Sequence, residues 1–283
     1  GPSDQPVQVF KGRITGIEAD YPEHGGGHIL ALAEDKLQAL RMTRRTRSFE
    51  DVSDEDVIRQ IANEHSLTPQ LDLNGPTYKV LTQVNQSDLA FIRERARSIN
   101  AELWVQETTL FAQARTDRTS GGIDLSYGVN LLSFTVQADL AQQCSELGVA
   151  GWDVENKDGI EETAAENAIS AELGGDTSGS SILQQAFAPR KERIVHTVPF
   201  TVEEARAVAQ ARYRERARRF ITGTGLADGD GQIRVGRTVT LSRLGSLFNG
   251  KYYVVRVRHS YDRTYGFRTE FDVERPGLGQ AQQ

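Results

Sequence analysis

Apolar and charged residues alternate near the end of the chain with the two-residue period of a β-strand. Between Tyr253 and His259 the apolar side chains alternate with Arg256 and Arg258, so one face can be buried while the other stays charged. The returning segment repeats this pattern, and its charged positions are Arg268, Glu270 and Asp272. Residues 248–273 therefore predict an antiparallel hairpin with one buried face, in which arginines and carboxylates meet across the ladder.

The beginning of the chain carries a similar strand–turn–strand pattern. Residues 7–21 alternate as a strand, a glycine-rich turn follows, and residues 29–35 return. The corresponding positions in the two hairpins are Phe10 and Phe248, Gly12 and Gly250, and Ile17 and Val255. This duplication predicts two related β-domains, one of them interrupted by an insertion. Residues 1–33 supply only a hairpin, which is marginal alone, so we expect either further strands upstream or a neighbour that completes the sheet.

The pattern changes to mixed helix and strand over residues 34–117, which predicts an inserted α+β domain. Ser53 begins one amphipathic helix, with Asp56 at the capping-box position, and Ser87 begins a second. The acidic run at residues 54–56 therefore belongs to a helix N-terminus, where carboxylates complement the helix dipole. This interpretation is favoured over a catalytic or metal-binding cluster.

Residues 118–283 return to strands and contain one long helix. The stretch 161–191 is rich in Glu, Ala, Ser and Gly, and we expect a mobile loop or a surface extension there. Thr201 and Glu204 form a second capping box that predicts a helix over 201–221. Six arginines lie on the polar side of this helix, which either is solvated or meets an acidic partner.

Composition limits the classes of function. The chain has 283 residues, enough for about two domains, and a net charge of −6 that argues against a general nucleic-acid binder. Cys144 is the single cysteine, which excludes an internal disulfide and a Cys-rich zinc site. No apolar run approaches the roughly 20 residues that span a bilayer, so we expect no membrane insertion. The Gly1–Pro2 pair is typical of the remnant that a protease leaves when it removes an expression tag. We therefore expect the natural chain to begin further upstream.

Catalytic and metal-binding patterns are weak. His24 and His28 lack a third ligand at a telling spacing, and no nucleophile, base and orienting residue come together. We therefore expect no catalytic, cofactor or metal site. Two other functions stay open: a cell-wall hydrolase, which loss of cleavage on mutating Asp153 or Glu155 would favour, and a monomeric module that binds sugars or peptides.

Several stretches together resemble a known family, the phage late-control D proteins. These belong with the tail-hub proteins of contractile phages and with the hub portion of the VgrG spikes of type VI secretion systems. The resemblance covers most of the chain. The residues that carry it most specifically are Gln83, Asn85, Ser87, Asp88, Leu89, Phe91, Trp152, Asp153, Gly250, Tyr252, Tyr253, Val254, Val257, His259 and Phe271.

The resemblance implies an α+β protein with two tube-like antiparallel β-barrels, the first incomplete here, and an inserted small α+β domain. Three copies would form a pseudo-sixfold ring that joins a hexameric tail tube to a trimeric spike. The implied partners are other copies of the chain, a tail tube protein, a spike or spike-tip protein and other baseplate proteins. Such a hub is assembled in the bacterial cytoplasm and becomes part of a virion tail or injection particle. Two departures stand out, because the first barrel lacks its N-terminal strands and no needle follows Arg275.

A barrel that docks edge to edge in a ring needs ordered β-edges that are apolar on the core side and form salt bridges on the other. We expect Tyr252, Arg256 and Arg258 on this wet face, as lumen or as subunit contact, with a solvent-facing surface as the alternative. The candidate assembly surface consists of Tyr252, Arg256, Arg258, Arg268 and Glu270.

Overall fold

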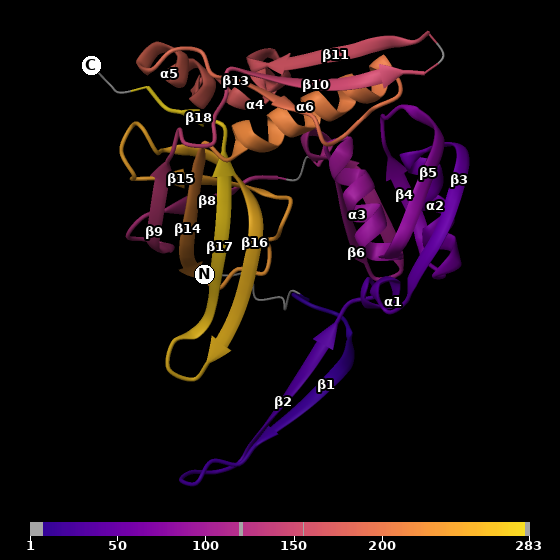
Figure 1. Cartoon of the computed structure of the whole chain (residues 1–283). Helices are drawn as coiled ribbons and strands as arrows, with labels where there is room; N and C mark the ends of the chain where they lie inside the picture. Colours follow the sequence, from indigo (N-terminus) through magenta and orange to yellow (C-terminus); the bar gives the residue numbers. More distant parts are fainter. Residues whose placement is uncertain (1–7, 119–120, 155, 281–283) are drawn as a thin grey trace. The chain divides into compact units, whose positions relative to one another are not determined.

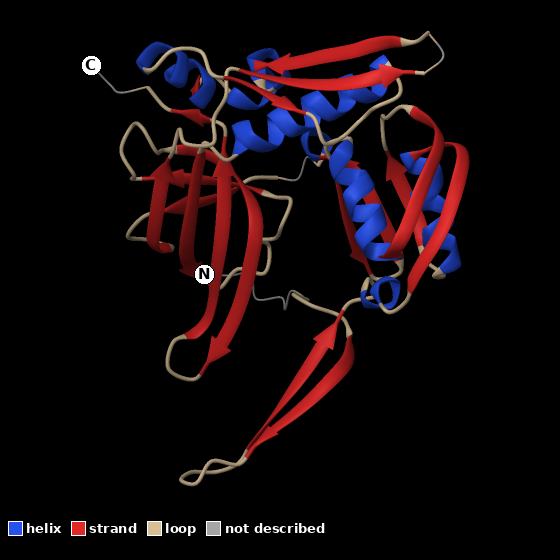
Figure 2. Ribbon diagram, in the orientation of Figure 1, coloured by secondary structure: helices blue, strands red, loops and turns tan. Residues whose placement is uncertain are grey.

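The computed structural model describes residues 8–118, 121–154 and 156–280 (Figure 1). These residues fall into two compact units, one comprising residues 8–114 and the other beginning at Arg115. Each unit combines strands with helices (Figure 2). The expected α+β class is therefore confirmed.

The first unit opens with a hairpin of two strands, β1 (Arg13–Asp20) and β2 (His28–Glu34). They pair antiparallel from Arg13 opposite Glu34 to Asp20 opposite His28, with an irregularity in register between Ile14 and Gly16. The short helix α1 (Gln38–Arg41) follows. The chain thus forms the hairpin that the alternating pattern of residues 7–35 predicts.

Two antiparallel strands and two helices make up the centre of the first unit. Strand β3 (Arg44–Ser53) pairs with β5 (Thr77–Ser87), and each leads directly into a helix, α2 (Asp54–Glu64) and α3 (Asp88–Ser98). A second sheet consists of β4 (Thr68–Asp72), β7 (Thr109–Ala114) and β6 (Ala101–Gln106), in that order. The two helices start at the predicted caps.

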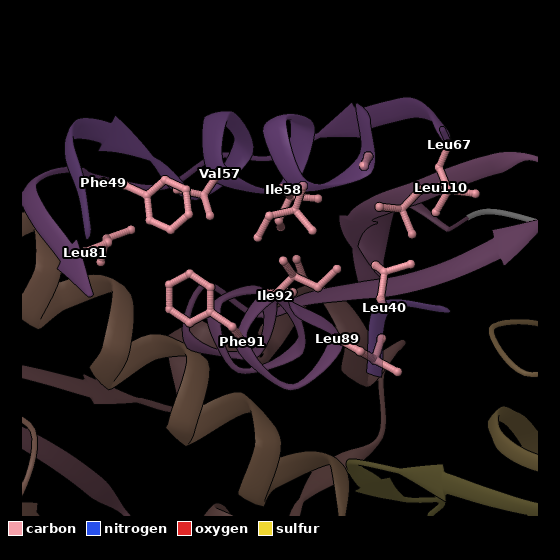
Figure 3. Close-up of a cluster of buried hydrophobic side chains, with 14 of the residues drawn as sticks. Leu40, Phe49, Val57, Ile58, Leu67, Leu81, Leu89, Phe91, Ile92 and Leu110 are labelled. Atoms are coloured by element: carbon pink, nitrogen blue, oxygen red, sulfur yellow. The ribbon is translucent and has the colours of Figure 1, made fainter. Parts of the chain in front are cut away.

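The core of this unit lies between the helices and the strands (Figure 3). Val57, Ile58 and Ile92 are completely buried, and Phe49 stacks on Phe91 with ring centroids 5.9 Å apart. Burial of each such side chain contributes about 1.5–3 kcal/mol to folding. The predicted apolar stripe of α2 is thus the face that packs in the core.

The two strand–helix segments repeat each other. Ser53 and Ser87 both cap their helices with a side-chain oxygen, which accepts from the backbone N–H groups of Asp56 and Ala90. Left-handed backbone conformations recur at matching places in the two segments: Asp51 (φ 50°) and Asn85 (φ 46°) before the helices, Ser66 (φ 54°) and Asn100 (φ 61°) after them. This second internal repeat is not among the features predicted from the sequence.

A six-stranded sheet dominates the second unit and curls into a half-barrel (Figures 1 and 2). Its strands, in spatial order, are β8 (Ile123–Ser126), β15 (Thr238–Ser242), β16 (Gly250–Asp262), β17 (Gly266–Arg275), β14 (Ile221–Asp228) and β9 (Leu131–Ala138). All neighbours are antiparallel except β8 and β15. The predicted hairpin at the end of the chain is β16–β17, the centre of this sheet.

A second layer of this unit packs helix α6 (Val202–Arg218) against a small sheet. The sheet has the order β11 (Asp158–Ala165), β10 (Glu146–Asp153) and β13 (Lys191–Ile194). The hydroxyl of Thr201 accepts from the backbone N–H of Glu204, as predicted for the start of this helix. The helix ends at Arg218, three residues before the predicted 221, because Ile221 already belongs to β14.

The expectation of a mobile loop at residues 161–191 is wrong, because this stretch forms helices and strands. The stretch contains the end of β11, the helical turn η2 (Glu166–Ala168), helices α4 (Ser170–Leu173) and α5 (Gly179–Ala186), and strand β12 (Thr177–Ser178), which pairs with β18 (Gly277–Leu278). Ile169 and Leu183 are buried in it. Gly179 allows close packing, because a Cβ added there would lie 2.6 Å from the ring of Phe220.

Arginines on the polar side of α6 have partners within the chain. Arg206 pairs with Glu162, Arg216 with Glu192 and Arg218 with Glu172. Arg214 donates to the backbone oxygen of Ala168. Because these guanidinium groups already have partners, the helix gives no support to an acidic partner docking on it.

Candidate assembly surface

The outer face of the half-barrel is polar across four strands. One row of opposed residues runs Thr135, Thr224, Asp272, Arg256, from β9 to β16. The side chains that share this face alternate with buried ones along each strand, as in a sheet with one solvated face. The charged residues on it are Asp228, Arg256, Arg258, Arg268, Glu270, Asp272 and Glu274.

Tyr252 does not belong to this face, contrary to the expectation from the sequence. Its exposed fraction is 1%, and its neighbour Tyr253 is only half-buried. The cause is a shift of register between Val254 and Arg256, which places one extra residue in β16. Such a bulge exchanges the faces of the residues on its two sides, so the alternation that holds from Arg256 onward is reversed before it.

Tyr252 instead anchors the core of the half-barrel. Its hydroxyl donates to the backbone oxygen of Phe248 at 2.7 Å, and its ring meets that of Phe134 edge-on, with centroids 5.7 Å apart. The guanidinium of Arg275 lies 5.2 Å from the ring centroid. Burial raises the pKa of the Tyr252 phenol above its usual value. These contacts indicate a structural residue.

The remaining four expected residues lie on the polar face. Arg256 binds Asp272 (Nε–Oδ2, 2.5 Å) and Glu270 (Nη2–Oε1, 3.1 Å), as the predicted ladder requires. The hydrogen bond from Arg256 holds the pKa of the Asp272 carboxyl below its usual value, against the smaller effect of burial. Arg268 pairs with Asp228 at 3.0 Å. Arg258 is exposed and stands opposite Glu270 in the register.

A depression of about 370 Å³ lies on the same face. Its lining residues are Thr135, Gln137, Thr222, Gly223, Thr224, Val255, Asp272, Val273 and Glu274. The two carboxylates in it are both paired, Asp272 with Arg256 and Glu274 with Arg115 at 2.8 Å. An acid–base pair for hydrolysis needs one carboxyl that holds a proton near neutral pH, and ion pairs favour the opposite state.

The hairpin β1–β2 exposes a wholly apolar face. Opposed pairs in its register are Ile17 with Ala31 and Ala19 with Ile29. Ile14, Ile17 and Ile29 are 66–72% exposed. Monomeric soluble proteins rarely leave such a continuous apolar strip open to water, so this face is suited to a contact with another chain. The alternation from Ile17 to Ala19 is the sequence signal for this face, but these residues were not predicted to belong to the assembly surface.

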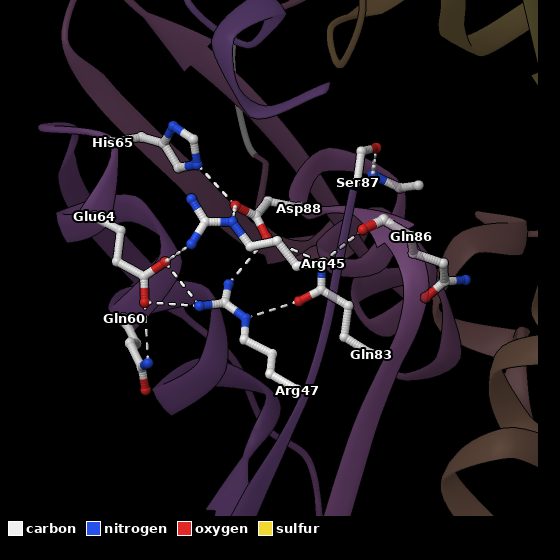
Figure 4. A network of polar contacts seen from close by, with 10 residues as sticks. Arg45, Arg47, Gln60, Glu64, His65, Gln83, Gln86, Ser87 and Asp88 are labelled. Carbon is white, nitrogen blue, oxygen red and sulfur yellow. Dashed lines mark hydrogen bonds and ion pairs between the residues drawn. The ribbon is translucent and has the colours of Figure 1, made fainter. Parts of the chain in front are cut away.

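A polar network in the first unit centres on the Asp88 carboxylate (Figure 4). It binds Arg47 at 2.9 Å, His65 at 2.8 Å and Gln83 at 2.9 Å, and Arg45 lies 3.3 Å away. The side chain is only 2% exposed. Its partners come from β3, from β5 and from the residue that caps the end of α2, and Asp88 itself begins α3, so the network ties together the elements of the repeat.

The Asp88 network is structural in character. Burial raises the pKa of this carboxyl, but the hydrogen bonds from His65 and Gln83 and the charges of Arg47 and Arg45 outweigh burial, so the net pKa lies below its usual value. A carboxylate held ionised by this many donors has no proton to give and no free lone pair for a substrate. Gln83 and Asp88 are among the residues that carry the family resemblance in the sequence, whereas Arg45, Arg47 and His65 were not predicted.

The other residues considered for chemistry stay apart. Among residues 8–118, 121–154 and 156–280, no three His, Cys, Asp or Glu side chains are grouped so as to hold a metal ion. The Asp153 carboxylate accepts from the backbone and side chain of Asn156 and so closes a turn. Glu155 lies outside the described residues. Within the described part of the chain, no helix is long and apolar enough to cross a membrane.

Solved structures of tail and secretion proteins share this fold. The 43 kDa tail protein of prophage MuSo2 from Shewanella oneidensis matches with a TM-score of 0.69 and 14% identity, over 93% of this chain and 77% of that one. A tail protein from Neisseria meningitidis matches with a TM-score of 0.68 and 12% identity, over 95% and 80%.

A third similar structure is the Escherichia coli c3393 protein, described as a component of the type VI secretion system with similarity to the T4 tail proteins gp27 and gp5. Its TM-score is 0.58 and its identity 10%, over 96% of this chain and 62% of that one. At these identities the likeness concerns the fold. This likeness of fold agrees with the resemblance of the sequence to phage tail and VgrG-type proteins in general.

The comparisons of sequence give a more limited result. None of the curated proteins matches this chain. The family model described as the Alg8 N-terminal domain, Alg8_N, matches residues 1–262. The chain therefore belongs to the Alg8 N-terminal domain family.

Proposed function

We propose that the chain is a structural hub protein of a contractile injection machine, either a phage tail or a related secretion system. The observation that carries this proposal is the fold, which two tail proteins share over more than nine-tenths of this chain. The late-control D resemblance narrows the proposal to a baseplate hub. The machine that contains it would be assembled in the bacterial cytoplasm and include this chain in the finished particle.

In this role three copies form a ring that adapts a hexameric tail tube to a trimeric spike. Two features of the described residues support association of the chain with itself. The apolar face of β1–β2 is open to solvent, and the polar face of the half-barrel carries charges of both signs. Contacts with a tail tube protein, a spike protein and other baseplate proteins complete the assignment.

In this proposal the hub has no catalytic activity. The carboxylates with the most suitable positions, Asp88, Asp272 and Glu274, are all held by arginines. We therefore assign this chain to scaffolding, with no cofactor. A hydrolase would need a cleft in which at least one carboxyl is free to carry a proton at neutral pH.

Sedimentation velocity at micromolar concentration tests the proposal. We expect a trimer, with threefold symmetric rings in negative-stain images. A monomer at all accessible concentrations would contradict the hub. A monomer that binds saccharide would support the second candidate, a binding module, for which the depression lined by Thr135, Thr222 and Thr224 is the specific observation. A peptidoglycan-release assay, repeated with Asp153→Asn, separates both from an enzyme.

A further inference from the structure

The long strand β16 has an unpaired edge over its second half. Strand β15 pairs with β16 only from Gly250 to Tyr253, and the backbone of Val254 still bonds to Gly236 and Arg237. From 256 to 262 β16 pairs on its other side with β17. Among the described residues, no backbone hydrogen bond is made on its outer side there. An edge of this length is a ready acceptor for another strand.

The two faces of this β16 segment differ in character. Val257 and Tyr261 lie on the face that continues the core, opposite Phe271 and Phe267, and Tyr261 is 76% exposed. The other face carries Arg256 and Arg258 on β16 itself, with Asp272 and Glu270 opposite them on β17 and Arg268 opposite Ser260. Arg263 is exposed in the connecting turn. The accepting edge is thus flanked by an apolar face with an exposed tyrosine and by a polar face on which the edge strand itself contributes arginines.

Hairpin β1–β2 has the complementary character. On strand β1, Ile17 and Ala19 lie on the apolar face, while Glu18 and Asp20 lie on the other. The outer edge of β1 has no strand partner among the described residues. Strand β1 has 8 residues, about the length of the free edge of β16. If β1 adds to that edge, the apolar face of β1 continues the apolar face of β16. The carboxylates of β1 then lie beside the arginines of β16. Both side-chain alternation and cross-strand charge pairs favour this arrangement.

We propose that strand β1 of one copy adds to the free edge of β16, residues 256–262, in a second copy. Strand β1 is chosen over β2 because the carboxylates Glu18 and Asp20 lie on β1, whereas β2 carries Leu30 and His28 at the opposed positions. The contact joins two different surfaces, so successive copies can close into a ring. This inference rests on the proposed function, because it names the surfaces through which the hub associates with itself.

A charge-exchange experiment tests the contact. One variant carries Arg258→Glu and Arg263→Glu, a second carries Glu18→Lys and Asp20→Lys, and a third combines all four substitutions. Each of the first two places like charges together, and we expect the dissociation constant for self-association to rise at least about tenfold. The combined variant restores opposite charges, and we expect recovery to within about threefold of the original chain. Sedimentation velocity at several concentrations gives these constants.

Matched controls reverse exposed charges away from both hairpins. Lys79→Glu with Arg93→Glu changes the net charge as the first variant does, and Glu50→Lys with Asp72→Lys matches the second. Neither control should alter association. Circular dichroism and thermal unfolding verify that every variant is folded, which the exposure of the substituted side chains favours.

The outcomes separate this contact from the proposed function. If both charge-reversed variants still form trimers, the proposed contact is wrong, while the proposed hub function stands. Dissociation by both variants without recovery in the combined variant also overturns it, because complementarity predicts recovery. If the original chain is a monomer at all concentrations, the proposed function fails and the contact fails with it.

Discussion

Arg256 lies directly opposite Asp272 across the β16–β17 ladder, and its Nε binds the carboxylate at 2.5 Å. The hydroxyl of Thr224 donates to the same carboxylate from the neighbouring strand β14. One carboxylate thus joins three adjacent strands on the polar face. The arrangement makes Asp272 the most informative residue for the electrostatics of this surface.

The Asp272 carboxyl should make the stability of the second unit sensitive to acid. Its pKa in the folded chain lies below the usual value of 3.8, so it stabilises the fold above that pH, and this contribution is lost as the pH falls through the lower folded value. We expect Asp272→Asn to remove this part of the acid dependence. Urea unfolding between neutral and acidic pH measures it. An unchanged pH profile in the variant would contradict the assignment.

We expect the buried Asp88 network to contribute strongly to the free energy of unfolding of the first unit. Replacing Asp88 by Ala leaves Arg47 beside His65 without the shared carboxylate, and breaking a buried ion pair in this way costs about 3–5 kcal/mol. Asp72 is an exposed carboxylate of the same unit, and Asp72→Ala should cost less than about 0.5 kcal/mol.

The chain offers a local probe for this measurement. Trp104 stacks on Phe111 in the first unit, with ring centroids 5.1 Å apart, and the chain has only one other tryptophan, Trp152. In a Trp152→Phe background, fluorescence during urea unfolding reports on residues 8–114. An Asp88→Ala variant whose transition coincides with that of Asp72→Ala would contradict a structural role for the network.

Local patterns in the sequence are sufficient to predict much of this fold. The helices at Ser53, Ser87 and Thr201 begin where a side-chain cap precedes an apolar stripe, because capping depends on residues three positions apart. The charged ladder of β16–β17 follows from alternation alone. Four of the five candidate surface residues are on the polar face for this reason.

The failures have a common physical cause, which is that they depend on tertiary contacts. The bulge in β16 reverses the face of Tyr252, and no local signal marks where an extra residue enters a strand. The stretch 161–191 has the composition of a loop, yet Ile169 and Leu183 are buried by segments distant in sequence. Arg45 and His65 join Asp88 only because β3 and the end of α2 meet the start of α3.

The hydroxyl of Tyr252 provides a direct test of the corrected placement. Tyr252→Phe removes its hydrogen bond to Phe248 and leaves a partly buried acceptor without this donor, so we expect a loss of about 1 kcal/mol in the free energy of unfolding. Self-association should not change, since the ring does not reach the polar face. A variant with normal stability but weakened association would return Tyr252 to the assembly surface.

Tyr213 is the natural counterpart of Tyr252, because its ring is equally buried but its hydroxyl makes no hydrogen bond of standard geometry among the described residues, although the Ser180 side chain interacts with it. Burial raises the pKa of this phenol from 10.0 to about 12. Its neutral form stabilises the fold fully below pH 10, and the contribution is lost as the pH rises toward 12. We expect Tyr213→Phe to leave stability at neutral pH unchanged or to raise it by up to about 1 kcal/mol, since an unsatisfied hydroxyl is removed.

In an alkaline titration followed by phenolate absorbance, the Tyr213→Phe variant should lack the phenol that ionises near pH 12 in the original chain. A loss of stability as large as that of Tyr252→Phe would mean that the Tyr213 hydroxyl makes a bond in solution.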